Sequence, residues 1–130
     1  MAFEDLPDSD DDNAAITREE FDHAVDRMKK SKATGPDEIP AEVWQNSAVA
    51  RDQLFTFLQQ VWNKETVPEN LATCLFVMMY KNKGSPDDCT KYRALGLLNH
   101  AYKIMSVILL KRLVDECAGF LSDWQAGFRA

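Results

Sequence analysis

The sequence predicts an α+β domain that is rich in helix and carries one small antiparallel β-hairpin or sheet. Three observations support this fold class. Apolar residues recur at helical spacing in three separate stretches. Two short apolar runs flank a turn-rich loop, which is typical of a β-hairpin. The chain has 130 residues and is 45% hydrophobic, which is enough to bury one core.

The first 15 residues are acidic, and we expect them to form a disordered tail ahead of a domain that spans residues 16–130. Asn13 stands where a calcium loop needs glycine, and Leu6-Pro7 replaces the incoming helix of such a loop. These departures favour a solvated tail over a calcium site, although four carboxylates have calcium-loop spacing: Asp8, Asp10, Asp12 and Glu19.

A first helix is predicted from Thr17 to about Lys32. Thr17 and Glu20 have the spacing of a capping box, and Ile16 and Phe21 have that of a hydrophobic staple. One apolar face then follows at helical intervals: Phe21, Ala24, Val25 and Met28.

A turn and two further helices are expected next. Gly35-Pro36 ends the first helix, and Pro40 suits the first turn of a short helix that carries Val43 and Trp44. A third helix is predicted over residues 48–64 and ends before Val67-Pro68. Its apolar side consists of Leu54, Phe57, Leu58, Val61 and Trp62.

The predicted hairpin follows. Residues 73–80 indicate a buried strand, with a short helix as the alternative, and residues 92–98 indicate its partner across a basic loop. A last long helix runs from about Asn99 towards Cys117 and ends near Gly119. Its buried side is predicted to contain Ala101, Ile104, Met105, Ile108 and Leu109. A second capping box begins at Ser122.

Charge is distributed unevenly along the chain. The net charge is −6, yet residues 1–26 carry −9 and residues 81–112 carry +5. Because partner choice depends on the local field, the basic block is the candidate binding surface. Its cations on or beside the hairpin can bind phosphates, although lysines also protect exposed strand edges from aggregation. Tyrosines 80 and 92 alternate with these cations: Lys81, Lys83, Lys91 and Arg93.

Other candidate sites are weaker. Asp87-Asp88 could resemble a polymerase metal pair, but it follows Ser85-Pro86 in a loop, so a solvated turn is the preferred interpretation. His23 and His100 lack companions for a metal or nucleophile site and are expected to be surface or capping residues. The three cysteines show no C-x-x-C pattern and are expected to be reduced thiols. We therefore expect no metal site.

Three motifs, in the same order along the chain, resemble motifs of the reverse transcriptases of non-LTR (LINE-type) retrotransposons. Residues 29–44, KKSKATGPDEIPAEVW, resemble the family's K-A-T-G-P-D-G-I-P-A-E motif. Residues 80–99 resemble its K-K-G…C-x-x-Y-R-x-I-x-L-L segment, and residues 125–130 resemble Q-x-G-F-R. Glu38 departs from a frequent glycine, and Ala94-Leu95-Gly96 stands where the family often has G-I-S.

The resemblance implies that residues 16–130 are part of the fingers domain, which precedes the palm in these polymerases. It implies that Arg93, with Lys81 or Lys83, contacts the triphosphate of an incoming nucleotide. Residues near the template path would be Gln125, Gly127, Phe128 and Arg129. An RNA or DNA template–primer, or a deoxynucleoside triphosphate, would then be a weakly bound partner.

The family's palm motifs, F-x-D and Tyr-x-Asp-Asp, would follow Ala130. Because their aspartates hold the metal ions of phosphoryl transfer, we expect no polymerase activity from this chain alone and Mg²⁺ only in a complete enzyme. With no secretory signal and no long apolar run, we expect an intracellular protein, nuclear or cytoplasmic, and no membrane partner.

A second function stays open. The chain could be a helical interaction or self-association module that binds no nucleic acid. Its acidity and three apolar residues near the C-terminus favour this alternative: Phe120, Trp124 and Phe128.

Overall fold

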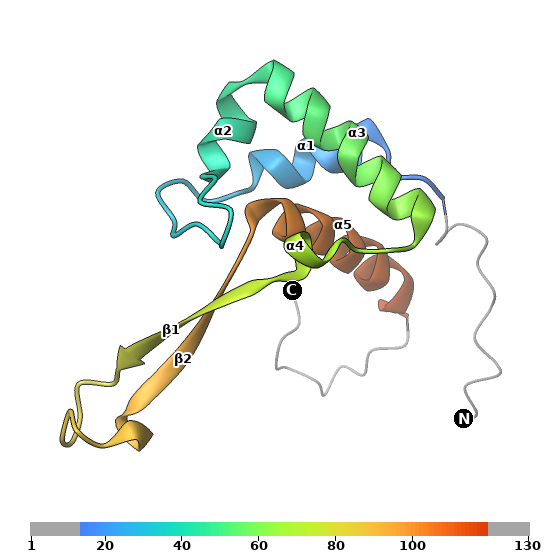
Figure 1. Cartoon of the computed structure of the whole chain (residues 1–130). Helices are drawn as coiled ribbons and strands as arrows, with labels where there is room; N and C mark the ends of the chain where they lie inside the picture. The colour runs from blue at the N-terminus through green and yellow to red at the C-terminus, as the bar shows by residue number, and fades with distance from the viewer. Residues whose placement is uncertain (1–13, 120–130) are drawn as a thin grey trace.

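A computed structural model describes residues 14–119. Figure 1 shows the helices gathered into one body, from which the two strands extend as a long arm. The mixture of helices with one antiparallel hairpin confirms the predicted α+β class. In chain order the elements are α1 (Arg18–Asp26), α2 (Ala41–Asn46), α3 (Ala48–Lys64), α4 (Glu69–Ala72), β1 (Cys74–Tyr80), a short 3₁₀ helix η2 (Cys89–Lys91), β2 (Tyr92–Leu98) and α5 (His100–Cys117).

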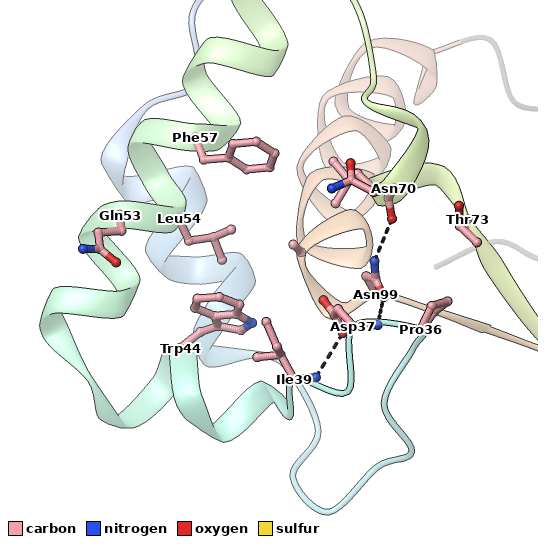
Figure 2. Close-up of a pocket in the computed structure, with 12 residues that line it drawn as sticks. Pro36, Asp37, Ile39, Trp44, Gln53, Leu54, Phe57, Asn70, Thr73 and Asn99 are labelled. Atoms are coloured by element: carbon pink, nitrogen blue, oxygen red, sulfur yellow. Dashed lines mark hydrogen bonds between the residues drawn. The ribbon is translucent and has the colours of Figure 1, made fainter.

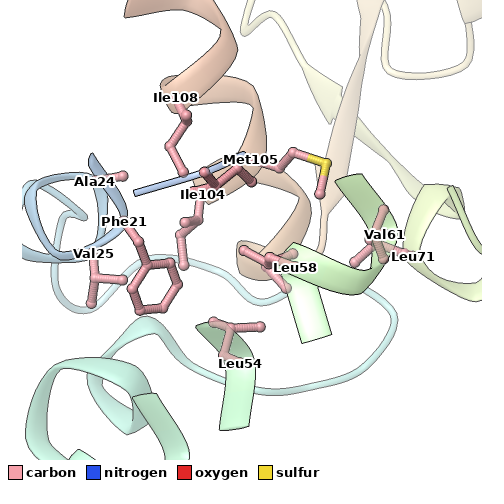
Figure 3. Close-up of a cluster of buried hydrophobic side chains, with 12 residues drawn as sticks. Phe21, Ala24, Val25, Leu54, Leu58, Val61, Leu71, Ile104, Met105 and Ile108 are labelled. Carbon is pink, nitrogen blue, oxygen red and sulfur yellow. The ribbon is translucent and has the colours of Figure 1, made fainter. Parts of the chain in front are cut away.

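The core lies between α1, α3 and α5, with one side chain from α4. Figure 3 shows the buried side chains of these helices pointing towards one another. Three of the fully buried side chains come from these helices, one from each: Phe21 of α1, Leu58 of α3 and Ile104 of α5. The remaining core residues from these helices are Ala24, Val25, Leu54, Val61, Leu71, Ala101, Met105 and Ile108. Most of the predicted apolar faces therefore meet in one cluster.

The start of α1 confirms the predicted capping box, because Thr17 accepts from the Glu20 amide and Glu20 accepts from the Thr17 amide. The predicted end near Lys32 is wrong, since α1 ends at Asp26. Gln45 of α2 donates to the carbonyls of Val25 and Met28 and thereby satisfies acceptors at the helix end. No apolar side chain from 29 to 32 is present to hold a further turn against the core.

The bounds of α3 match the predicted range, but its buried face is centred differently. Leu54, Leu58 and Val61 are buried, whereas Phe57 is 38% exposed. Phe55 packs on Phe21 instead, with ring centroids 5.2 Å apart. The face turns towards α1 because α1 supplies the apolar surface there. The single-turn helix α4 was not predicted, since four residues are too few to show a helical period.

Arg112 of α5 joins three parts of the body. Its guanidinium donates to both carboxylate oxygens of Glu20 at 2.8 and 2.7 Å and to the carbonyls of Ala14 and Ala15 at 2.7 and 3.2 Å. It also lies 5.1 Å from the ring centroid of Trp62. The hydrogen bonds from Arg112 lower the pKa of Glu20 to about 2.

The two strands pair antiparallel, in a register that sets Cys74 opposite Leu98 and Tyr80 opposite Tyr92. The predicted partner strand has the observed bounds, but the prediction that β1 is buried is wrong. Phe76 is 69% exposed and Met78 is 58% exposed. Among the described residues the sheet has two strands and no helix packs along either face, so the apolar run stays open to solvent.

The helix α5 confirms the predicted start and end, but two of its side chains differ from expectation. Leu109 is 39% exposed because it lies at the rim of the face centred on Ile104 and Ile108. His100, predicted to be a surface or capping residue, is only 2% exposed, because the first turn of α5 lies between the base of β2 and the segment after α1. His23 is exposed as predicted. The capping box at Ser122 lies outside the described residues.

Candidate nucleic-acid interface

The tip of the hairpin is held by side chains of the hairpin itself. The Tyr80 hydroxyl donates to the Gly84 carbonyl, and the Tyr92 hydroxyl donates to the Pro86 carbonyl at 2.8 Å. The two tyrosine rings lie across the strands, with centroids 5.5 Å apart. The tip loop therefore has a defined shape although it is far from the core (Figure 1).

Asp88 caps the short helix η2. Its carboxylate accepts from the amide and hydroxyl of Thr90 at 2.9 and 2.7 Å, and these bonds lower its pKa. Lys91 lies 3.9 Å from the same carboxylate. This confirms the prediction that Asp87-Asp88 is part of a turn, since Asp88 is used to shape the loop.

The four predicted cations of the tip divide into two pairs. The Lys81 ammonium donates a hydrogen bond to the Thr90 carbonyl at 3.0 Å, and the Lys91 ammonium faces the Asp88 carboxylate. Lys83 and Arg93 are exposed, and neither has a hydrogen bond or ion pair within residues 14–119. The first pair stabilises the loop, whereas the second pair is available to an external anion.

The strand register places Lys81 and Arg93 on one face. Arg93 is opposite Met79, and the Lys81 amide donates to the Lys91 carbonyl at 2.8 Å, so the ladder continues one residue past Tyr80. Residues 79 and 81 point to the same side of a strand, which makes Lys81 a diagonal neighbour of Arg93. Residues 81–93 carry a net charge of +2. Arg93 can therefore hold a phosphate group here through charge-assisted hydrogen bonds, and the neighbouring Lys81 adds positive charge to the same face.

The base of the hairpin is fixed by Asn99, which the sequence did not single out as a site. Asn99 accepts from the Asp37 amide at 3.1 Å and donates to the Asn70 carbonyl at 3.1 Å (Figure 2). Gly35 packs so closely here that an added Cβ would lie 2.4 Å from the Asn99 nitrogen. The Gly-Pro-Asp motif thus binds the junction between β2 and α5.

A cavity of about 560 Å³ lies beside this junction, between the α2–α3 side and the α4–α5 side. Figure 2 shows Trp44 and Phe57 pointing into it from the α2–α3 side. The Trp44 indole N–H is buried and has no hydrogen-bond partner in the part of the chain that the structure describes. The exposure of Phe57 noted above is exposure to this cavity, which the helical period alone could not indicate.

For the remaining predicted sites the structure adds no contacts or distances. The template-side residues all lie outside the described residues: Gln125, Gly127, Phe128 and Arg129. Within residues 14–119 no group of three or more histidine, cysteine or acidic side chains is arranged to hold a metal ion. No helix in that range is long and apolar enough to cross a membrane.

Comparison of the chain with protein-family models and with curated proteins gave no match. The assignment of the hairpin tip as a candidate nucleic-acid interface therefore rests on the arrangement of charge and hydrogen bonds at the hairpin, together with the motif resemblance.

Proposed function

We propose that this chain is the fingers portion of a LINE-type reverse transcriptase and that its hairpin tip binds the phosphates of a template–primer or a nucleoside triphosphate. The observation that carries the proposal is the pair Lys83 and Arg93, which are exposed and without an ion-pair partner in the described part of the chain. The hairpin that carries them extends away from the helical body (Figure 1). Arg93 can bind a phosphate through two parallel hydrogen bonds.

The proposal assigns no catalytic residue to these 130 residues, and Mg²⁺ belongs only to a complete enzyme. The tip contributes positive charge and fixed hydrogen-bond donors, which orient an anionic ligand without performing chemistry on it. Binding through few phosphate contacts is weak and falls as salt rises, because each contact releases condensed counterions.

The test is fluorescence anisotropy of the full chain with a labelled primer–template, titrated across salt. The Lys83→Ala/Arg93→Ala variant should bind about tenfold more weakly at low salt, with a salt slope shallower by ~1 to 2. A Lys64→Ala/Lys111→Ala variant removes the same charge from α3 and α5 and should bind like the wild type. Equal affinity of the wild type and the tip variant would contradict the proposal.

A second candidate function, self-association, is favoured by the exposed apolar strands. Leu75, Phe76 and Met79 of β1 are all about half exposed or more. A large uncovered apolar surface commonly marks a protein contact. Sedimentation velocity across a concentration series tests this: a monomer at every concentration contradicts self-association, and a dimer that Phe76→Ser disrupts supports it.

A further inference from the structure

A second hollow, which we call the basal groove, lies between the segment after α1, the base of β2 and the first three turns of α5. It has a volume of about 670 Å³. Its aliphatic floor includes Leu95, Leu97, Val107 and Leu110. Its charged residues are Arg27, Lys29, Lys32 and Lys103, and no carboxylate lines it among the described residues.

His100 lines the basal groove and is only 2% exposed, yet neither of its ring nitrogens has a hydrogen-bond partner within residues 14–119. Burial lowers its pKa and nearby Lys103 lowers it further, while Asp37 and Glu42 act in the opposite direction. A neutral imidazole offers one donor and one acceptor. Buried polar groups in folded proteins are normally hydrogen-bonded, so the unpaired nitrogens of His100 beside the groove point to a ligand that supplies polar partners here.

The groove fits an acidic peptide better than a nucleic acid. Cations on its rim attract carboxylates or phosphates equally well. The floor favours the carboxylates of a peptide, since bases bind single-stranded sites mainly by stacking on large aromatic rings, and no phenylalanine, tyrosine or tryptophan lines the groove among the described residues. Aliphatic side chains instead suit the apolar side chains of a peptide, and a peptide backbone carries both the donor and the acceptor groups that a neutral imidazole can bond.

The chain contains such a peptide within reach. Residues 1–13 hold six carboxylates together with Met1, Phe3 and Leu6. Arg112 of α5 binds the Ala14 carbonyl, where this segment joins the domain. Lys103 lies nine residues earlier on α5, which is ~14 Å along a helix, whereas thirteen residues can span up to ~45 Å. Residues 120–130 carry one acid and one base and lack this complementarity.

We propose that the basal groove is a binding site for an acidic, apolar peptide segment and that residues 1–13 of the same chain occupy it. The apolar side chains of the segment pack on the aliphatic floor, and its carboxylates pair with the cations of the rim. This site is separate from Lys83 and Arg93 at the hairpin tip, so it does not depend on the function proposed above.

Heteronuclear NMR of the isotope-labelled full chain tests the occupant. Phe3→Ser/Leu6→Ser should shift the amide signals of 95–98 and 103–110, and raising salt from about 0.05 to about 0.5 M should shift them in the same direction. The control Val49→Ser/Val67→Ser alters two exposed apolar residues outside the groove and should leave these signals unchanged. Groove signals that ignore Phe3→Ser/Leu6→Ser, or that respond instead to Trp124→Ser/Phe128→Ser, would overturn the proposal.

A labelled peptide with the sequence of residues 1–13 tests the site directly. It should bind the Phe3→Ser/Leu6→Ser chain at least ~10-fold more tightly than the wild type, whose own segment competes at high effective concentration. Adding Lys29→Glu/Lys103→Glu should weaken that binding ~10-fold. Equal peptide affinity for the wild type and the Phe3→Ser/Leu6→Ser chain, or peptide displacement by a short single-stranded RNA, would count against the assignment.

Discussion

The helical body and the hairpin arm are built from similarly apolar sequences but are stabilised differently. In the body, Phe21, Leu58 and Ile104 are fully buried and packed by several helices. In the arm, Phe76 and Met78 face solvent, and the strands are joined by their hydrogen-bond ladder and the contacts at the tip. The body therefore supplies most of the free energy of folding, whereas the arm presents a surface.

This difference shows that apolar composition does not by itself determine burial. A continuous apolar run is buried only if other elements cover it, and a two-stranded arm has no such cover here. Exposed strand surface is available for binding, and exposed strands also open locally at lower free energy than a core helix.

The largest contrast should come from a pair of matched substitutions. Phe21→Ala removes a fully buried ring and should lower the free energy of unfolding by about 3 to 5 kcal/mol. Phe76→Ala removes a ring that is 69% exposed and should change it by less than about 0.5 kcal/mol. Urea denaturation followed by circular dichroism measures both. Similar losses in the two variants would show that the arm packs against something in solution.

A smaller effect is expected at the Glu20–Arg112 pair of the body. Glu20 has a folded-state pKa of about 2 against an ordinary value of 4.5, so its contribution is complete above pH 4.5 and is lost as the pH falls towards 2. The loss amounts to about 3 kcal/mol. Urea denaturation at several pH values measures it. The Glu20→Gln variant should lose this part of the acid dependence, and an unchanged profile would refute the pairing.

The junction of body and arm gives the next effect. Gly35→Ala would place a Cβ 2.4 Å from the Asn99 nitrogen, and because that neighbour is backbone, the loop must move. We expect a loss of about 2 kcal/mol in the free energy of unfolding. Thermal denaturation measures it, with Gly119→Ala as the control because no described atom outside its chain neighbours would lie within 4 Å of the added Cβ. A loss confined to Gly35→Ala supports close packing at the junction.

The smallest effect is a gain. Glu38 has a φ of 57°, a left-handed conformation that favours glycine, and it stands where the resembling family has glycine. Glu38→Gly should therefore raise the free energy of unfolding by about 0.5 to 1 kcal/mol. Chemical denaturation measures the gain. Glu38→Ala, which keeps a Cβ, should give no such gain, and equal stability of the two variants would exclude backbone strain as the cause.

Much of the fold could be predicted from local patterns. The capping box at Thr17, the bounds of α3 and the second strand follow from caps, helical periods and turn residues close in sequence. The failures concern contacts between distant segments. The end of α1 comes earlier than its local sequence indicates, where Gln45 of α2 binds the carbonyls of Val25 and Met28, and α4 is too short to show a helical period.

The candidate site was only partly predictable for the same reason. The alternation of cations and tyrosines indicated a basic hairpin tip, and the structure brings Lys81 and Arg93 onto one face. The sequence could not show that Lys81 and Lys91 are used within the tip, because those hydrogen bonds depend on the loop conformation. Nor could it indicate that His100 is buried against the basal groove, since its neighbours come from elements far along the chain.

The side chain of Asn99 lies at the pivot between the hairpin arm and the helical body. It fixes the point at which the arm leaves the body, through bonds to Asp37 and Asn70. Each strand of the arm has seven residues, which corresponds to a length of ~23 Å. A rotation of ~10° at this pivot therefore moves the tip cations by ~4 Å, more than the length of a hydrogen bond. A single amide side chain near the core thus helps to determine where Arg93 is held relative to the helical body.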